Sequence, residues 1–235
     1  DKEKLILELE YFYEILQRYN VDLHFVKPSK KHPWQMYTRD TAFVIYDTLY
    51  FSQTRERSDR IGEIDMLLKS ISAFRSSKIV EISGGKIEGG DVLVDTDCIY
   101  VGMSNRSSNQ AIEELAGYVP IYPIHLGDRI MHLDTCFPIL PKKNALIFRD
   151  AFKKNDLDNL SRRFNLIEVS GLEARRMATN VLVINPEVII MHKDFKRIAG
   201  IVEAKGIKVE SVDFSEPNSL LGSFRCATLP LQRFS

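Results

Sequence analysis

Short apolar segments that open on a polar residue occur five times along the chain. Their first residues are separated by steps of 51, 43, 46 and 46 residues. The segments begin Asp40-Thr-Ala-Phe-Val-Ile, Asp91-Val-Leu-Val, Asp134-Thr-Cys-Phe-Pro-Ile, Asn180-Val-Leu-Val-Ile and Cys226-Ala-Thr-Leu-Pro-Leu. A period of this length is typical of stacked supersecondary units, each of which cannot bury its apolar face alone.

Between these segments, strand and helix patterns alternate in a fixed order. Apolar residues three and four positions apart predict helices over 3–19, 58–74, 108–116, 156–164 and 195–205. Four hairpin patterns precede the last four helices, at 41–45 with 48–51, 92–94 with 99–101, 135–140 with 145–148, and 181–184 with 188–191. A fifth strand is predicted over 226–231, in a unit that the N-terminal segment would complete. We therefore expect a single α/β domain over residues 1–235, with five units around one axis.

Composition narrows the class of protein. The 32 basic and 32 acidic residues balance, which gives no reason to expect nucleic acid or an anionic membrane as a partner. The three cysteines are irregularly spaced and do not form a disulfide framework, so we expect a reducing, cytoplasmic setting. No stretch approaches the roughly 20 apolar residues that span a bilayer. The sequence leaves monomer and homodimer open.

A cysteine and a histidine are the first candidates for chemistry. Cys226 and His132 flank equivalent strand openings two units apart, so folding would bring them to one end of the axis. Arg225 and the turn at Gly222-Ser223-Phe224 would favour the Cys226 thiolate, which is the reactive form. The alternative is that Cys226 is a small buried apolar side chain.

His132, Asp134 and Cys136 alternate on the predicted strand 135–140 and its approach, which would point all three to one face. Two functions fit this pattern. His132 is a general acid and base beside Asp134, or the three residues bind a metal together with His125. A histidine that is only hydrogen-bonded in the core is the third interpretation. The metal interpretation is the weaker functional one, because no Cys-x-x-Cys or His-x-x-x-His spacing supports it.

Carboxylates gather at the same repeat positions. Asp40, Glu88 and Asp134 would surround the predicted thiolate, and Gly89 and Gly90 would let the backbone approach a neighbour closely. Carboxylates beside a thiolate are typical of a site for a cation. The planar guanidinium, with its many donors, matches paired carboxylates best.

Five motifs carry a family resemblance. They are Tyr37-Thr38-Arg39-Asp40, Glu88-Gly89-Gly90-Asp91, Gly102-Met103-Ser104-Asn105-Arg106, Met131-His132-Leu133-Asp134-Thr135 and Arg225-Cys226-Ala227-Thr228-Leu229-Pro230-Leu231. In this order they resemble the guanidino-group-modifying superfamily of arginine deiminases, dimethylarginine dimethylaminohydrolases and amidinotransferases. The resemblance implies a five-bladed α/β propeller of ββαβ-type repeats, the pentein fold, in agreement with the repeat count.

The resemblance also implies roles for individual residues. Cys226 would be the nucleophile, His132 the acid and base, and Glu88 its carboxylate partner. Substrate-binding roles fall to Asp40 and Asp134 for the guanidinium, and to Arg60 and Arg106 for the α-carboxylate. Relatives have Asn or Asp where this chain has Trp34, and often a glycine run where it has Gly222-Ser223-Phe224. These departures concern substrate identity more than the type of reaction.

The predicted activity is hydrolysis of arginine or an N-methylated arginine through a covalent thiouronium on the cysteine. The partner is then a small guanidino substrate, and no metal or organic cofactor is needed. Amidino transfer by the same covalent chemistry is the alternative within enzymes. A non-catalytic propeller that binds a partner is the alternative from another class.

Overall fold

The computed structural model describes residues 1–52, 60–71 and 78–233. The described chain forms two compact units, each made of two stretches of sequence. The first unit contains Asp1–Leu23 and Asp134–Arg225, and the second contains His24–Leu133 and Cys226–Ser235. None of the helices in the described residues combines the length and apolarity that a bilayer crossing needs. The prediction of a single domain over 1–235 stays a prediction.

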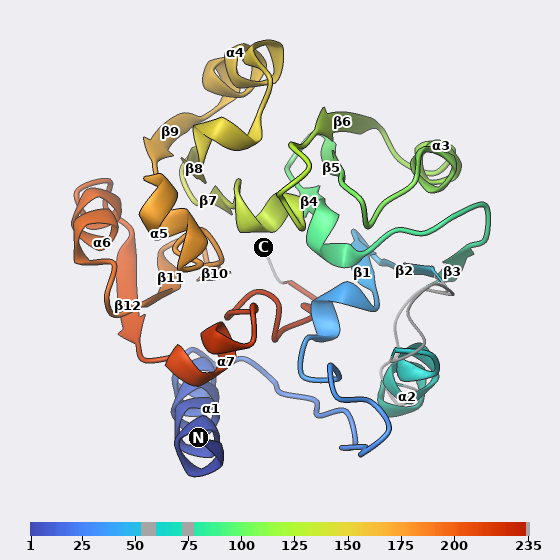
Figure 1. Ribbon diagram of the computed structural model, residues 1–235, viewed down its shortest axis with the longest axis horizontal. Coiled ribbons are helices and arrows are strands. Elements are labelled where there is room, and N and C mark those ends of the chain that lie inside the picture. The colour runs from blue at the N-terminus through green and yellow to red at the C-terminus, as the bar shows by residue number, and fades with distance from the viewer. Residues whose placement is uncertain (53–59, 72–77, 234–235) are drawn as a thin grey trace. The chain divides into compact units, whose positions relative to one another are not determined.

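The second unit contains two successive ββαβ repeats (Figure 1). In each repeat an antiparallel hairpin is followed by a helix and by a third strand that pairs in parallel with the second. The elements are β1 (Phe43–Ile45), β2 (Thr48–Ser52), α2 (Glu63–Ser70), β3 (Ile79–Ile82), β4 (Val92–Val94), β5 (Ile99–Met103), α3 (Asn109–Ala116) and β6 (Ile121–His125).

The first unit contains two further repeats of the same kind, together with three helices outside the repeats. Its repeats are β7 (Ile139–Leu140), β8 (Asn144–Ile147), α4 (Lys154–Arg163) and β9 (Asn165–Glu168), then β10 (Leu182–Asn185), β11 (Val188–His192), α6 (Lys196–Glu203) and β12 (Lys208–Val212). The additional helices are α1 (Lys2–Arg18), α5 (Gly171–Arg175) and α7 (Ser215–Ser219).

Local sequence accounts for these elements. The Ser108 side chain caps α3 by accepting from the Ala111 N–H, and the helix buries Ala111, Ile112 and Leu115 on one face. These side chains pack against strand residues such as Val92 and Ile99 in one apolar cluster of the second unit. The middle strands β2, β5, β8 and β11 are buried almost throughout, because a strand lies on each side of them.

Three of the polar residues that open the apolar segments lie in short 3-10 helices, each of which precedes the first strand of a repeat. Asp40 ends Thr38–Asp40, Asp91 ends Gly89–Asp91, and Asp134 lies within Leu133–Thr135. The prediction that His132, Asp134 and Cys136 alternate along a strand is therefore wrong. The chain is wound at Leu133–Thr135, and the strand begins only at Ile139.

The four predicted hairpins and the five predicted helices are confirmed, although the predicted ends 58–59 and 72–74 lie outside the described residues. The third strand of each repeat was missed. The predicted fifth strand over 226–231 is wrong, because the described residues there form a turn and an irregular segment. The Cys226 carbonyl accepts from the Arg39 N–H, and Pro230 has no N–H to donate to a ladder.

Candidate active site

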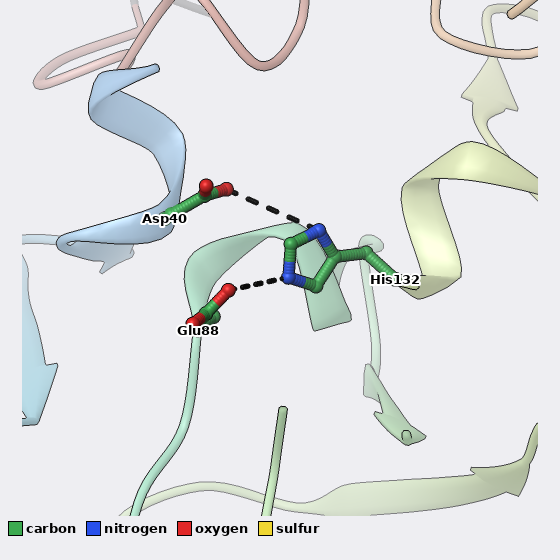
Figure 2. Close-up of side chains that lie close together, drawn as sticks. All are labelled: Asp40, Glu88 and His132. Carbon is green, nitrogen blue, oxygen red and sulfur yellow. Dashed lines mark hydrogen bonds and ion pairs between the residues drawn. The ribbon is translucent and has the colours of Figure 1, made fainter. Parts of the chain in front are cut away.

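Three side chains from distant segments meet in the second unit: His132, Glu88 and Asp40 (Figure 2). His132 Nε2 lies 2.7 Å from Glu88 Oε2, and His132 Nδ1 lies 3.9 Å from Asp40 Oδ1. Side-chain exposure is 2% for His132, 3% for Glu88 and 12% for Asp40. The imidazole is thus buried between two carboxylates, one in hydrogen-bond contact and one slightly beyond it.

Electrostatics at this site favour the charged histidine. Burial alone would lower the pKa of His132, but its hydrogen bond to the Glu88 carboxylate and the charges of Asp40 and Asp91 raise that pKa to about 10. Burial likewise tends to raise the pKa of Glu88, yet the hydrogen bond and charge of His132, followed by the charges of Arg106 and Arg60, lower it. An imidazolium at neutral pH is a proton donor, so this arrangement can act as a general acid.

Two glycines allow close packing at this site, Gly90 against His132 and Gly89 against the segment that carries Asp40. A Cβ on Gly90 would lie 2.7 Å from both Cγ and Nδ1 of the His132 ring. A Cβ on Gly89 would lie 2.3 Å from the Arg39 carbonyl oxygen and 2.5 Å from that of Ala42. The expectation from Glu88-Gly89-Gly90-Asp91 that the backbone approaches a neighbour closely is confirmed, and one of those neighbours is the candidate acid.

Asp91 is a further residue of this site, although its place in the sequence indicates only the start of a strand. It is fully buried, and its Oδ2 accepts from Ser104 Oγ at 2.5 Å and Ser107 Oγ at 2.7 Å. Its Oδ1 accepts from the Leu133 N–H at 2.9 Å. Burial raises the pKa of Asp91 to about 6, although the charge of His132 and these hydrogen bonds oppose the rise. Asp91 therefore holds the segment that carries His132. Its place in the repeat, equivalent to that of Asp40 and Asp134, is the sequence feature that could have identified it.

Cys226 lies in the same unit as His132, in the turn that replaces the predicted fifth strand, and is 6% exposed. The preceding residue, Arg225, belongs to the first unit. There its Nε donates to Asp134 Oδ2 at 3.0 Å, and its backbone N–H donates to Asn180 Oδ1 at 3.1 Å. Arg225 was expected to favour the thiolate by its charge, but a fully buried carboxylate faces that charge. The proposed guanidinium-binding role of Asp134 stays a prediction.

The two predicted substrate-binding arginines differ in their surroundings. Arg60 is buried, at 4% exposure, and donates hydrogen bonds to Asp40, Glu63 and the Tyr37 carbonyl. The Arg106 side chain is 32% exposed, and its Nη1 lies 3.9 Å from Glu88 Oε1, which is too long for a hydrogen bond.

Among the described residues, the possible ligand atoms of Asp40, Glu88 and His132 lie within 4.8 Å of one another. With the His132 pKa raised to about 10, the imidazolium itself supplies the positive charge between these carboxylates. The metal interpretation considered from the sequence, with His132, Asp134 and Cys136 on one strand face, loses its basis because Leu133–Thr135 is a 3-10 helix.

Comparison with known proteins adds family evidence to this geometry. The family model for N,N dimethylarginine dimethylhydrolase, eukaryotic, matches residues 1–233. An uncharacterised protein of Bacillus subtilis, YkgA, is 34% identical over 94% of this chain and 77% of its own length. The dimethylarginine dimethylaminohydrolase of Pseudomonas aeruginosa is 23% identical over 97% of this chain and 89% of its own length.

Solved structures share the fold. The N-terminal domain of ArgZ, solved with a covalently bound reaction intermediate, superposes with a TM-score of 0.89 at 23% identity. The match covers 99% of this chain and 88% of that one. Together with the mixed α/β repeats and the motifs, these matches show that the chain belongs to the N,N-dimethylarginine dimethylhydrolase family, among the hydrolases that act on carbon–nitrogen bonds of linear amidines.

Proposed function

We propose that this protein is a cysteine hydrolase that converts arginine or an N-methylated arginine to citrulline, with release of ammonia or an alkylamine. The observation that supports this most is the buried His132 between Glu88 and Asp40. A proton donor held among carboxylates fits a cationic substrate whose leaving nitrogen must be protonated. We also propose a five-bladed α/β propeller, in which residues 226–231 and the N-terminal segment complete the fifth unit.

In the first half of the reaction, the Cys226 thiolate attacks the guanidinium carbon and forms a carbon–sulfur bond. Asp40 and Glu88 stabilise the positive charge of the guanidinium. We assign the same role to Asp134, because it occupies the matching position in its sequence motif. His132 then gives its proton to the leaving nitrogen, the carbon–nitrogen bond breaks, and a thiouronium remains on Cys226.

In the second half, the neutral His132 takes a proton from water as the water oxygen attacks the thiouronium carbon. The carbon–sulfur bond breaks, the thiolate of Cys226 is restored, and the ureido product leaves. His132 has then recovered its proton, and the released amine takes up the additional proton of the substrate guanidinium in solution. Arg106 and Arg60 are the residues that we expect to bind the α-carboxylate, and the Arg106 side chain is exposed enough to meet a ligand.

Mass spectrometry tests the proposal directly. The purified protein is incubated with arginine, monomethylarginine, asymmetric dimethylarginine or agmatine, and products and acid-quenched intact protein are measured. We expect citrulline from at least one arginine substrate and a covalent adduct on Cys226, both absent in Cys226→Ser. Product formation that requires an added amine acceptor would indicate an amidinotransferase. Binding without any turnover would contradict the proposal and favour a binding protein.

A further inference from the structure

A single buried carboxylate, that of Asp91, connects two segments of the candidate site that lie far apart in the sequence. Its Oδ1 accepts from the N–H of Leu133, the residue that follows His132, at 2.9 Å. Its Oδ2 accepts from two hydroxyls of the loop after β5, from Ser104 Oγ at 2.5 Å and from Ser107 Oγ at 2.7 Å. One side chain therefore holds both segments.

The loop after β5 is attached to Asp91 through Ser104. The Ser104 hydroxyl donates to Asp91 Oδ2, and the same hydroxyl oxygen accepts from the Arg106 N–H at 3.0 Å. The Ser107 N–H donates to the Ser104 carbonyl at 3.3 Å, which closes a turn around Arg106. The position of the Arg106 backbone therefore depends on a hydroxyl that Asp91 orients.

We propose that Asp91 is a positioning residue of the reaction, which holds His132 and the backbone of Arg106 in one arrangement and adds its negative charge to those that face the imidazole. The inference rests on the proposed function for its substrate, but its contacts lie wholly within the second unit. Asp91 acts through its neighbours, because it is fully buried and donors of this chain engage both of its carboxylate oxygens.

The backbone of Asp91 extends this arrangement to the carboxylate partner of His132. The Asp91 N–H donates to the Glu88 carbonyl at 3.0 Å, across the 3-10 helix Gly89–Asp91. Glu88 Oε2 in turn lies 2.7 Å from His132 Nε2. Asp91 thus contacts Glu88 through its backbone and the His132 segment through its side chain, so a displacement of Asp91 changes the contact between the two.

Close packing holds the Asp91 carboxylate in this place. A Cβ on Gly102 would lie 2.6 Å from Asp91 Oδ1 and 2.9 Å from the Leu133 Cβ. Strand β5 can therefore approach both residues this closely only because residue 102 has no side chain. The hydrogen bonds and the packing of β5 together fix the oxygen that accepts from the Leu133 N–H.

Charge gives Asp91 a second effect on His132. Burial raises the pKa of Asp91 to about 6, against the charge of His132 and the three hydrogen bonds, so the carboxylate is mostly ionised at neutral pH. Burial would lower the pKa of His132, but the hydrogen bond to Glu88 and the charges of Asp40 and Asp91 raise it to about 10. Asp91 therefore supports the protonated imidazole that the leaving nitrogen needs.

Steady-state kinetics with arginine over a range of pH test the two effects separately. Asp91→Asn keeps the shape of the side chain and removes its charge, so kcat should fall about tenfold and its alkaline limit should move to lower pH by about 1 unit. Ser104→Ala keeps the charge and removes the hydroxyl that holds the Arg106 N–H, so KM should rise about threefold or more with the alkaline limit in place. An unchanged alkaline limit in Asp91→Asn, or an unchanged KM in Ser104→Ala, would overturn the inference.

Asp97→Asn is the matched control, because it makes the same chemical change at an exposed residue between β4 and β5. It should leave kcat, KM and the alkaline limit as in the wild type. Ser104→Ala decides the positioning role even if Asp91→Asn does not fold. If the wild-type protein acts on no guanidino compound, the proposed function fails, and NMR titration of the His132 ring tests Asp91 alone. A His132 pKa that is lower in Asp91→Asn but not in Asp97→Asn supports the inference, and an equal pKa in both contradicts it.

Discussion

The contact between Glu88 and His132 leads to a quantitative prediction. Glu88→Gln replaces the carboxylate by an amide of the same shape and removes the negative charge 2.7 Å from His132 Nε2. A hydrogen bond to a charged group contributes about 1.5–3 kcal/mol, and one pKa unit corresponds to about 1.4 kcal/mol. The His132 pKa, raised to about 10 in the wild type, should therefore fall by about 1 to 2 units in the variant.

The same change predicts how stability depends on pH. A histidine whose pKa is raised in the folded state contributes stability that is fully present below its unfolded pKa of about 6.5 and is lost as pH rises through the folded pKa. For the wild type this loss spans from about pH 6.5 to about 10. In Glu88→Gln the loss should be complete about 1 to 2 pH units earlier. The stability difference between the variant and the wild type should therefore be largest near about pH 6 and should shrink as pH rises toward about 10.

NMR titration of the His132 ring between pH 6 and 10.5 measures the shift, with the signal assigned by its loss in His132→Gln. Glu114→Gln is a matched control in the same unit, because Glu114 accepts from the Ser83 and Gly84 N–H groups and belongs to none of the contacts around His132. Its His132 titration should match the wild type. A Glu88→Gln protein whose titration also matches the wild type would refute the electrostatic reasoning.

Two further predictions concern the packing and the nucleophile. Gly90→Ala should push the His132 ring out of place and lower kcat/KM about 100-fold. Gly200→Ala is the control, because a Cβ there meets no atom within 4 Å, and it should leave activity unchanged and slightly stabilise α6. Equal activity of the two variants would contradict the packing argument. Cys226→Ser should abolish turnover with an unchanged circular dichroism spectrum, whereas Cys98→Ser should stay active; the reverse result would mean that the wrong sulfur was chosen.

The parts of the fold that could be predicted are those with a periodic burial pattern. The hairpins and helices were found because their apolar residues follow the period of the element. The third strands were missed because edge strands are only partly covered. In β3, for example, Ile79 is 53% exposed and only Ile82 is fully buried. The strand over 226–231 was inferred from repetition of the pattern, and repetition does not supply a pairing partner.

The candidate site could be predicted in its residue types but not in its contacts. Motif positions identified His132, Glu88 and Asp40, and the structure brings these three together. Arg225 and Asp134 pair although they lie 91 residues apart in the sequence, and no sequence pattern predicts this contact. Arg60 and Glu63, by contrast, form an ion pair three residues apart at the start of a helix, a spacing that can be recognised in the sequence.

Burial decides which role an arginine can take, and sequence does not report burial. A guanidinium withdrawn from water must first satisfy its own donors, so acceptors from the chain take precedence over those of a substrate. Arg60 meets this requirement with two carboxylates and a carbonyl, whereas the Arg106 side chain remains 32% exposed. To bind a substrate α-carboxylate as predicted, Arg60 would therefore have to exchange one of these partners, whereas Arg106 could meet a ligand from its present position.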